Sequence, residues 1–336
     1  MPIKAYAAMT AGKSLEPFTY QPGKLGPHEV EITITHCGLC HSDIHMIDND
    51  WGITQFPLVP GHEIVGTISD LGPEVAHVAK GDRVGVGWQA GSCFRCEWCA
   101  QGEETFCPEN RGTIVGRHGG FGDAVRCDGR FVFRIPEGLD SAAAAPLLCG
   151  GITVYSPLLE TARPASRVGI LGIGGLGHFA LQFANAFGCE VTAFSMTPEK
   201  EKEAKKFGAH HFVVSTDKGR MEKAAGSFDV LLSTVTAKMD WAAWMGLLRP
   251  KGALVFVGAA PGLLDVPAMS LVLGNKSVRG SAIGNRTRIR EMLSFAARHG
   301  IQAQIEVLPM SDVNKAIAKV KENKARYRMV LENKGR

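Results

Sequence analysis

A glycine-rich turn between a predicted strand and a predicted helix constrains the fold more than any other feature. The segment Val168–Leu171 leads into Gly172-Ile173-Gly174-Gly175-Leu176-Gly177, which fits the pattern G-x-G-x-x-G. In such a turn Gly172 permits the tight bend, Gly174 lets the backbone approach a pyrophosphate, and Gly177 lets helix and strand pack closely. The N-terminus of the helix adds unpaired N–H groups and positive potential. The turn therefore indicates a dinucleotide-binding unit, with a merely flexible glycine turn as the alternative.

From about residue 150 onward, short β-branched runs alternate with helical patterns, which is the rhythm of a parallel sheet. We expect strands at Arg167–Leu171, Glu190–Phe194, Phe212–Val214, Phe228–Ser233, Ala253–Val257 and Ser277–Ser281. Helices between them include Gly175–Phe187 and Pro198–Phe207, the second with Thr197 as its N-cap. Six strands separated by helices predict an α/β, doubly wound Rossmann domain.

The first half of the chain shows strand patterns instead. Val30, Ile32 and Ile34 alternate with polar residues, which is the period-2 signature of a half-buried strand. Further short apolar runs lie between turns rich in glycine and proline, at Ile64–Ile68, Val84–Val86 and Phe131–Ile135. This half therefore predicts a β-rich domain.

The length of 336 residues exceeds the usual size of a single core and predicts two domains. Near the C-terminus, two helical patterns flank a short strand pattern at Gln304–Leu308, and we expect this segment to return to the first domain. The predicted domains are residues 1–150 with 286–336, which are β-rich, and residues 151–285, which bind the dinucleotide.

Charge and composition exclude several classes of partner. A net charge of +4, from 37 basic and 33 acidic residues, gives no reason to expect a nucleic acid. No segment approaches the about 20 uninterrupted apolar residues of a membrane helix, and the N-terminus lacks the apolar core of a signal peptide. We therefore predict a cytoplasmic protein. In that reducing compartment its nine cysteines suit metal ligation or buried packing better than disulfides.

The end of the second predicted strand bears on which dinucleotide binds. NAD-binding folds usually place Asp or Glu there to hold the ribose 2′-hydroxyl, but this chain has Ser195, followed by Thr197 and Lys200. A carboxylate would repel a 2′-phosphate, whereas a hydroxyl can donate to it. These residues favour NADP. The alternative is that Ser195 and Thr197 are only turn and capping residues.

Four cysteines lie close together in a glycine-rich loop. Cys93, Cys96, Cys99 and Cys107 form the pattern C-x2-C-x2-C-x7-C. Four thiolates at these spacings can surround one ion tetrahedrally, as closed structural zinc sites require. An iron–sulfur cluster is the rival, and Pro108 does follow the last cysteine as in ferredoxins, but the last gap is too long and no second motif occurs. We predict a structural zinc site.

A second, dispersed set consists of Cys40, His62 and Cys149. Catalytic zinc in dehydrogenases uses two cysteines and one histidine, which leaves one position open for water or substrate. Such a zinc ion lowers the pKa of an alcohol and polarises a carbonyl. The sequence alone does not show that these three residues meet in space, and each could be structural.

Several motifs in order along the chain resemble the zinc-containing medium-chain dehydrogenase/reductase superfamily. They are most similar to its cinnamyl alcohol dehydrogenase branch, which includes broad-specificity bacterial aldehyde reductases. The motifs are Cys37–His45, Pro57–Glu63, the four-cysteine loop, Pro146–Cys149, Gly151–Pro157 and the glycine turn. The resemblance runs nearly end to end and implies that the β-rich domain is a GroES-like catalytic domain. The one departure is a short stretch between Pro108 and Phe121.

The resemblance also implies roles for individual residues. Cys40, His62 and Cys149 would hold the catalytic zinc, with Glu63 as an alternative ligand and Asp43 orienting His62. Ser42 would accept the alcohol proton and His45 would pass it to solvent. The expected cofactor contacts are His41, Thr153, Gly172, Gly174, Gly175, Leu176, Gly177, Ser195, Thr197 and Lys200.

The implied activity is that of a zinc-dependent NADP(H) alcohol dehydrogenase or aldehyde reductase, with the substrate oxygen bound to zinc during hydride transfer. Trp51 and Trp88 are candidates for an aromatic or medium-chain substrate pocket, and core packing is their alternative. The resemblance also implies a homodimer, or a tetramer. Two other functions stay open: a zinc-free quinone reductase on the same fold, and a non-enzymatic NADPH-binding redox sensor that uses the cysteine loop.

Overall fold

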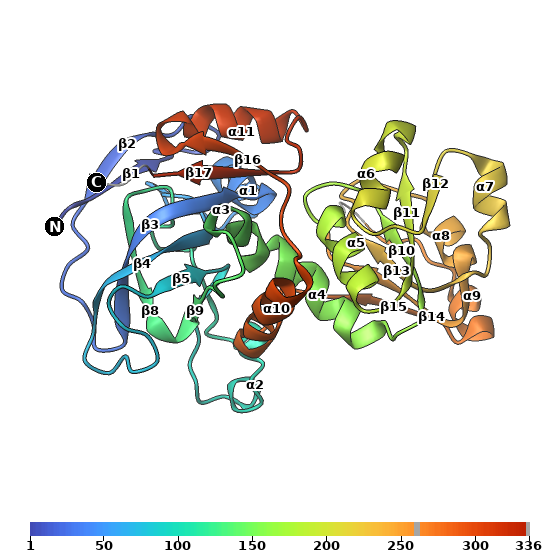
Figure 1. The fold of residues 1–336 in the computed structure, drawn as a ribbon, viewed down its shortest axis with the longest axis horizontal. Coiled ribbons are helices and arrows are strands. Elements are labelled where there is room, and N and C mark those ends of the chain that lie inside the picture. The colour runs from blue at the N-terminus through green and yellow to red at the C-terminus, as the bar shows by residue number, and fades with distance from the viewer. Residues whose placement is uncertain (259–262, 334–336) are drawn as a thin grey trace. The chain divides into compact units, whose positions relative to one another are not determined.

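The computed structural model describes residues 1–258 and 263–333. The chain divides into two compact units, Met1–Gly150 with Gly284–Arg336 and Gly151–Ile283, which we name the first and second unit. The second unit is one continuous segment, whereas the first is built from two segments far apart in the sequence (Figure 1). The last three residues of the predicted β-rich domain, 334–336, lie outside the described residues.

The second unit contains a six-stranded sheet in which every pairing is parallel. The strand order is β12-β11-β10-β13-β14-β15, so it reverses between β10 and β13, where ligands bind in this kind of sheet. The strands are β10 (Arg167–Leu171), β11 (Glu190–Ser195), β12 (His211–Val214), β13 (Phe228–Ser233), β14 (Leu248–Phe256) and β15 (Ser277–Gly280). The prediction of a six-stranded parallel Rossmann sheet is confirmed.

The helices of the second unit connect these strands. They are α4 (Gly150–Thr161), α5 (Gly177–Ala186), η4 (Pro198–Lys200), α6 (Glu201–Lys206), α7 (Lys218–Lys223), α8 (Trp241–Leu247) and α9 (Ala268–Gly274), where η denotes a 3₁₀ helix. Thr197 is the N-cap of η4 as predicted, with Pro198 in the first turn, but its side chain makes no capping bond. The Thr197 N–H donates to Ser195 Oγ at 3.1 Å. Strand β14 begins at Leu248, earlier than expected, because a proline and a glycine in its first half resemble a turn.

The first unit is centred on the long strand β3, whose residues Val30, Ile32 and Ile34 are buried as their alternation predicts. A seven-stranded sheet has the order β16-β17-β3-β4-β5-β9, with β8 also paired to β3, and two small sheets pair β1 with β2 and β6 with β7. The strands are β1 (Ile3–Ala7), β2 (Glu16–Tyr20), β3 (Glu29–Leu39), β4 (Glu63–Leu71), β5 (Arg83–Val86), β6 (Gln89–Gly91), β7 (Arg111–Gly112), β8 (Ala124–Asp128), β9 (Val132–Arg134), β16 (Ile305–Pro309) and β17 (Arg328–Glu332).

The helices of the first unit are mostly short and lie between these strands. They are α1 (His41–Asp48), α2 (Glu97–Ala100), η1 (Glu104–Phe106), η2 (Gly129–Phe131), α3 (Ser141–Ala144), η3 (Ala145–Leu148), α10 (Arg286–His299), η5 (Met310–Asp312) and α11 (Val313–Lys321). After α10 the chain adds β17, which is antiparallel to β3 and parallel to β16 (Figure 1). One hydrophobic core takes residues from both ends of the chain, from Ala5 to Leu331.

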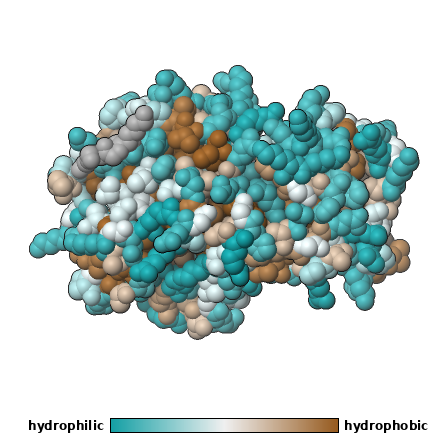
Figure 2. All heavy atoms as spheres, in the orientation of Figure 1, coloured by the Kyte–Doolittle hydropathy of each residue, from teal (hydrophilic) through white to brown (hydrophobic). Residues whose placement is uncertain are grey.

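On the face drawn in Figure 2, hydrophilic residues predominate. Within the described ranges no single helix has the length and apolar character needed to cross a membrane. One pair, Ser141–Leu148 and Gly150–Thr161, meets that test only when joined across a bend of 57°. Nearly all residues of α3 and η3 are buried, as expected for core helices.

Candidate functional site

Four potential metal ligands from three distant parts of the chain meet in the first unit. Cys40, His62, Glu63 and Cys149 each offer one ligand atom, and these atoms all lie within 4.8 Å of one another. The Sγ atoms of Cys40 and Cys149 are 4.0 Å apart. Two sulfurs of a tetrahedral zinc site with Zn–S bonds of about 2.3 Å lie about 3.8 Å apart. The two cysteines are therefore already near the spacing that one shared ion requires.

The local fold explains why these side chains converge. Cys40 directly follows β3 and is the N-cap of α1, while Glu63 opens β4 and pairs with Gly38 on β3. His62 is therefore adjacent to Cys40 across the sheet. Cys149 follows the buried helix η3, which packs against β3 and β4.

The donor atoms fit a zinc ion. The ring of His62 is fully buried and its Nδ1 is bonded to Asp43, yet its Nε2 has no hydrogen-bond partner among the described residues. A buried ring nitrogen is costly when it is left unpaired, and here it faces two thiols. Two sulfurs and one imidazole nitrogen form the donor set of a catalytic dehydrogenase zinc.

The carboxylate of Asp43 organises this group of ligands. It accepts hydrogen bonds from the Cys40 backbone N–H at 2.9 Å, from the Gly61 backbone N–H at 2.8 Å and from His62 Nδ1 at 2.8 Å. Burial lowers the pKa of His62, but the Asp43 carboxylate outweighs it and the net pKa lies well above the usual value. Asp43 thereby fixes the ring orientation and leaves Nε2 facing the thiols.

The two thiols influence each other's ionisation. The hydrogen bond from Cys149 lowers the pKa of Cys40 well below its usual value, although burial acts against this. The same contact, together with burial, raises the pKa of Cys149. The contact between the two sulfurs therefore moves their pKa values in opposite directions.

Glu63 is held in place by Arg328. The two side chains form a buried ion pair in which the Arg328 guanidinium donates to Glu63 Oε1. The Glu63 side chain is 0% exposed and that of Arg328 is 5% exposed. Burial raises the pKa of Glu63 to about 7, while Arg328 favours the charged form. A Cβ at Gly38 would lie 2.0 Å from Glu63 Oε2, so only glycine leaves room for this carboxylate. That Oε2 atom has no hydrogen-bond partner among the described residues.

The residues predicted to relay a proton lie on or beside α1. Ser42 Oγ is 3.8 Å from Cys40 Sγ, and His45 Nδ1 is 2.6 Å from Asp50 Oδ2. His45 is partly exposed and Asp50 is exposed, so this pair reaches solvent. His41, expected near the pyrophosphate, begins α1 and is exposed.

Both candidate pocket tryptophans lie beside the ligand group. The Trp88 ring meets the His62 ring edge-on at 5.0 Å, and Trp51 lies 5.9 Å from Trp88 and 5.4 Å from the His45 ring. Trp51 is 40% exposed, which argues against simple core packing. Trp51 and Trp88 thus link the ring of His62 to the ring of His45 through successive aromatic contacts.

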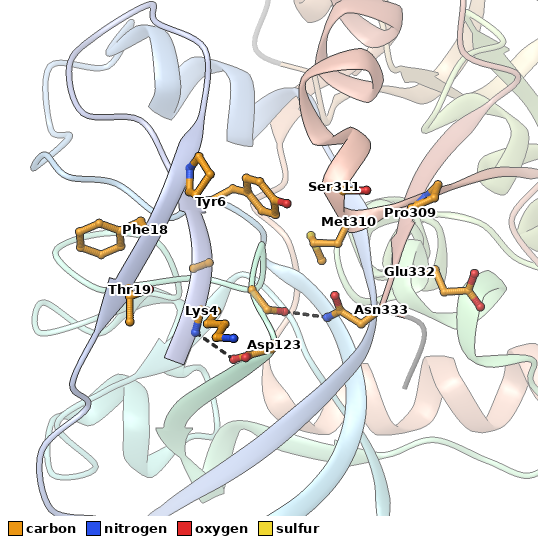
Figure 3. A pocket seen from close by; sticks show the side chains of 13 residues that line it. Lys4, Tyr6, Phe18, Thr19, Asp123, Pro309, Met310, Ser311, Glu332 and Asn333 are labelled. Atoms are coloured by element: carbon orange, nitrogen blue, oxygen red, sulfur yellow. Dashed lines mark hydrogen bonds between the residues drawn. The ribbon is translucent and has the colours of Figure 1, made fainter. Parts of the chain in front are cut away.

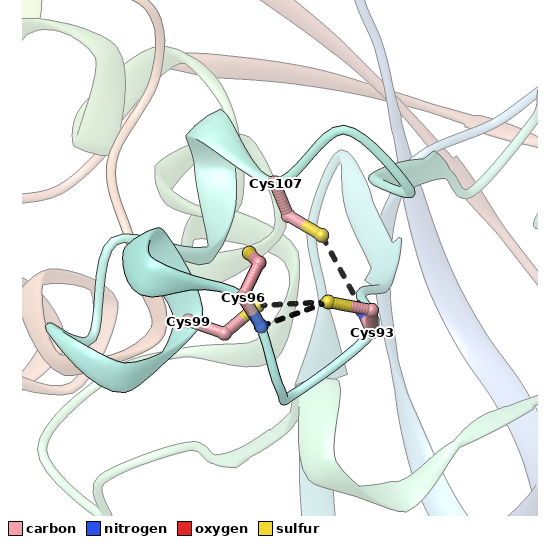
Figure 4. Close-up of side chains that lie close together, drawn as sticks. All are labelled: Cys93, Cys96, Cys99 and Cys107. Atoms are coloured by element: carbon pink, nitrogen blue, oxygen red, sulfur yellow. Dashed lines mark hydrogen bonds between the residues drawn. The ribbon is translucent and has the colours of Figure 1, made fainter.

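The four loop cysteines form a second ligand group in the first unit (Figure 4). Cys93, Cys96, Cys99 and Cys107 again have their sulfurs within 4.8 Å of one another, and Cys93 Sγ lies 3.9 Å from Cys99 Sγ. The backbone N–H of Arg95 lowers the pKa of Cys93 to about 6. Four sulfurs this close together fit the donor set of a closed structural zinc site.

The glycine turn of the second unit has the shape that a pyrophosphate site needs. Gly172 has a φ of +87°, which favours glycine, and a Cβ at Gly177 would lie 1.9 Å from the Gly172 carbonyl oxygen. A Cβ at Gly174 would meet nothing within 4 Å, so the turn has an open side there. Gly175 and Leu176 continue the turn and Leu176 is the N-cap of α5, while Thr153 lies on α4.

The residues expected near a 2′-phosphate lie beside this turn. Ser195 ends β11, is 8% exposed, and accepts from the Thr197 N–H at 3.1 Å. Lys200 Nζ donates to the Ile173 carbonyl at 2.7 Å, which ties the start of the next helix to the glycine turn. A serine hydroxyl that accepts a hydrogen bond can also donate its own proton to an acceptor. The cation, the hydroxyl and the turn therefore lie in one part of the second unit.

A separate hollow of about 510 Å³ opens between the β1–β2 hairpin and η5 (Figure 3). Its polar lining is partly engaged, because the Lys4 N–H donates to Asp123 at 3.1 Å and Asn333 Nδ2 to the Gly122 carbonyl at 2.8 Å. None of the metal ligands lines it. This hollow is distinct from the metal sites.

Comparison with known proteins identifies the family. Residues 26–137 match the alcohol dehydrogenase GroES-like domain and residues 175–298 match the zinc-binding dehydrogenase domain. An aldehyde reductase AdhA of Synechocystis sp. is 47% identical, over 98% of this chain and 99% of the relative. A probable cinnamyl alcohol dehydrogenase of Arabidopsis thaliana is 42% identical, over 97% and 93%. The chain belongs to the zinc-binding alcohol dehydrogenase family.

Solved structures of this dehydrogenase family agree with the fold. A cinnamyl alcohol dehydrogenase from Sorghum bicolor superposes with a TM-score of 0.94 at 40% identity, covering 99% of this chain and 98% of that one. A Helicobacter pylori CAD complexed with NADP(H) gives a TM-score of 0.90 at 31% identity, covering 99% and 98%. The resemblance inferred from sequence motifs is confirmed, and so is the combination of a GroES-like domain with a Rossmann domain.

Two residues of this zinc-binding dehydrogenase site were missed by the sequence analysis. Asp50 is only five positions from His45, and an acid near a relay histidine was a signal that could have been followed. Arg328 is 265 positions from Glu63, and β17 itself was not predicted. An arginine beside the apolar run Met329–Leu331 marks an unusual strand, but its partner is visible only in the fold.

The Asp43 network predicts a specific effect on metal binding. Changing Asp43→Asn removes the charge that orients His62, and we expect zinc affinity at this site to fall by about 10–100-fold. Competition with a chromophoric chelator measures this affinity. Asp48→Asn on the same helix is the matched control, since Asp48 pairs with exposed Lys321 and not with the ligand group. Equal affinity in the Asp43 and Asp48 variants would contradict the role assigned to Asp43.

Proposed function

We propose that this chain is a zinc-dependent NADP(H) alcohol dehydrogenase that also works as an aldehyde reductase. Its substrates are primary alcohols and aldehydes of the aromatic, cinnamyl or benzyl type, or of medium chain length. One observation carries the proposal: two thiols and a buried histidine with an unpaired Nε2 surround one position. The named relatives, an aldehyde reductase and cinnamyl alcohol dehydrogenases, support the same chemistry.

We assign Cys40, His62 and Cys149 as ligands of the catalytic zinc, and the four loop cysteines as ligands of a structural zinc. When bound, the catalytic zinc supplies Lewis acidity, which favours the alkoxide form of an alcohol and polarises a carbonyl. The nicotinamide cofactor supplies or accepts the hydride. Glu63, held by Arg328, is the adjacent carboxylate that can exchange into the ligand set.

The protein residues around the ligands hold and move the proton. Ser42 lies next to Cys40, where its hydroxyl can accept the proton of a bound alcohol. His45 carries it outward, and Asp50 Oδ2, at 2.6 Å from Nδ1, holds the imidazole ring in place. Asp43 holds the ligand histidine and takes no part in this transfer. Trp51 and Trp88 offer flat apolar faces, which suits an aromatic substrate.

NADP is the cofactor we assign. The supporting observations are Ser195 at the end of β11, Lys200 anchored at the glycine turn, and the absence of an acid at that strand end. Cofactor contacts at His41, Thr153, Thr197 and residues 172–177 are part of this proposal. The related structure from Helicobacter pylori was complexed with NADP(H).

The first experiment measures initial rates of benzaldehyde and cinnamaldehyde reduction with NADPH and NADH, on protein assayed for zinc. We expect turnover selective for NADPH, with about two zinc ions per chain. Equal rates with NADH would contradict the assignment from Ser195 but keep the enzyme class. A zinc-loaded protein that binds NADPH and reduces no aldehyde would instead favour the redox-sensor function.

The roles proposed for His45 in proton transfer and for Cys40 in zinc binding predict different outcomes when each residue is changed. His45→Gln is expected to lower kcat at least about tenfold, since a lost general acid–base group costs that much or more, and to keep its zinc. Cys40→Ser is expected to lose the catalytic zinc and the activity together. Steady-state kinetics and metal analysis on the same samples separate the two. Full activity in zinc-free Cys40→Ser would overturn the mechanism.

We also propose that the enzyme is cytoplasmic and forms a homodimer. All nine cysteines are free and six lie in the two ligand groups, which suits a reducing compartment. Strand β15 ends the described sheet of the second unit, and nearby α9 exposes Met269, Val272 and Leu273 by 61%, 70% and 80%. An open strand edge beside exposed apolar residues is a typical self-association surface.

The dimer proposal is tested by light scattering after size-exclusion chromatography. We expect a dimer for the wild-type chain and a monomer for Val272→Asp, because a charge in an apolar contact is costly. Ala225→Asp, at an exposed residue of the turn before β13, is the control and should stay dimeric. A monomeric wild type would refute the proposal, and a tetramer would require a second interface.

A further inference from the structure

The loop that carries the four cysteines is held from outside by Arg286, the first residue of α10. Its Nε donates to Glu104 Oε1 at 2.7 Å, its Nη2 donates to the same oxygen, and its Nη1 reaches the Arg130 carbonyl at 3.4 Å. Glu104 begins η1, in the stretch between Cys99 and Cys107. Arg286 therefore fixes the second half of the loop to α10.

The same guanidinium also contacts the first half of the loop. Phe94 lies between Cys93 and Cys96, and its ring packs under Arg130 at 3.9 Å and near Arg286 at 4.9 Å. Its backbone φ is +55°, the left-handed region that a bulky side chain rarely adopts. Such a conformation persists only when the surroundings hold it. The two guanidinium groups, with Phe131 at 5.7 Å from the Phe94 ring, supply that support.

The buried charge of Glu104 makes the local structure depend on its ion pair with Arg286. Glu104 is 2% exposed and forms an ion pair with Arg286, while its Oε2 has no hydrogen-bond partner among the described residues. A buried carboxylate that loses its cation is strongly destabilised. Without Arg286 the stretch from Cys99 to Cys107 would have to move Glu104 toward water, and that movement would separate the cysteines.

We propose that Arg286 is a positioning residue for the four-cysteine metal site. Its guanidinium packs against the Phe94 ring and pairs with the Glu104 carboxylate, so both halves of the loop are held. The four sulfurs therefore stay at ligand spacing, and a bound zinc ion dissociates slowly. The inference rests on the structural zinc of the proposed function, but it concerns metal retention and is independent of the alcohol and aldehyde chemistry. Its test therefore reads the loop cysteines directly and does not depend on turnover.

The experiment challenges zinc-loaded, full-length protein with a chelator in the presence of N-ethylmaleimide and follows each cysteine by peptide mass spectrometry. Zinc-bound thiols are protected, so labelling reports metal release at each site. For Arg286→Gln we expect the four loop cysteines to be labelled at least about tenfold faster than in the wild type, since a hydrogen bond to a charged group is worth that much. Labelling of Cys40 and Cys149, the internal reference, should stay unchanged.

Matched variants separate positioning from general loosening. Arg288 lies on the same first turn of α10, and its guanidinium pairs with Glu291 on the same helix, so Arg288→Gln should label like the wild type. Glu104→Gln combined with Arg286→Gln removes the buried charge and should recover part of the protection. Arg286→Lys keeps the charge but loses the planar group over Phe94. Its loop cysteines should be labelled at a rate between those of the wild type and Arg286→Gln.

Three results would overturn the proposal. They are unchanged loop labelling in folded Arg286→Gln, equal acceleration in Arg288→Gln, and acceleration of Cys40 and Cys149 as large as that of the loop. If Arg286→Gln does not fold, Arg286→Lys and the double variant carry the test. Loop labelling as slow as wild type in both of these variants would overturn it equally.

Discussion

The carboxylate of Asp43 is the interaction on which the catalytic site depends. It joins the start of α1, the turn before β4 and the ring of His62 through three hydrogen bonds of 2.8–2.9 Å. One charge therefore sets both the backbone that carries Cys40 and the orientation of the imidazole. Because the group is fully buried, it cannot exchange these partners for water. The ligand spacing follows from this network.

A buried ion pair extends the same organisation to the far end of the chain. Arg328 opens β17, and its guanidinium neutralises Glu63 next to the metal ligands. Arg286, at the start of α10, does the same for Glu104 in the cysteine loop. In both cases a residue from the C-terminal segment compensates a buried acid near a metal site. The segment after residue 283 thus completes two sites whose ligands all come from the first 150 residues.

Local sequence patterns predicted much of the secondary structure and one of the two ligand groups. They could not predict contacts between residues that are far apart in the sequence. Alternation gave β3 and the βα rhythm gave the parallel sheet, because both depend on near neighbours in the sequence. The four-cysteine loop was visible because its ligands lie within 15 residues, Cys93 to Cys107. The set of Cys40, His62 and Cys149 needed a family resemblance, and Arg328 and Arg286 were not anticipated. Their partners are 265 and 182 positions away.

The two-segment first unit has a consequence for synthesis on the ribosome. Domains fold as units as the chain emerges, and the continuous segment 151–283 is complete while the first unit still lacks β16 and β17. During that interval the end of β3 has an open hydrogen-bonding edge, and the nascent chain carries six clustered thiols with Glu63 unneutralised. Early zinc capture by those thiols would protect them from oxidation before the last strand arrives. Metal supply during translation then becomes a determinant of folding yield as well as of activity.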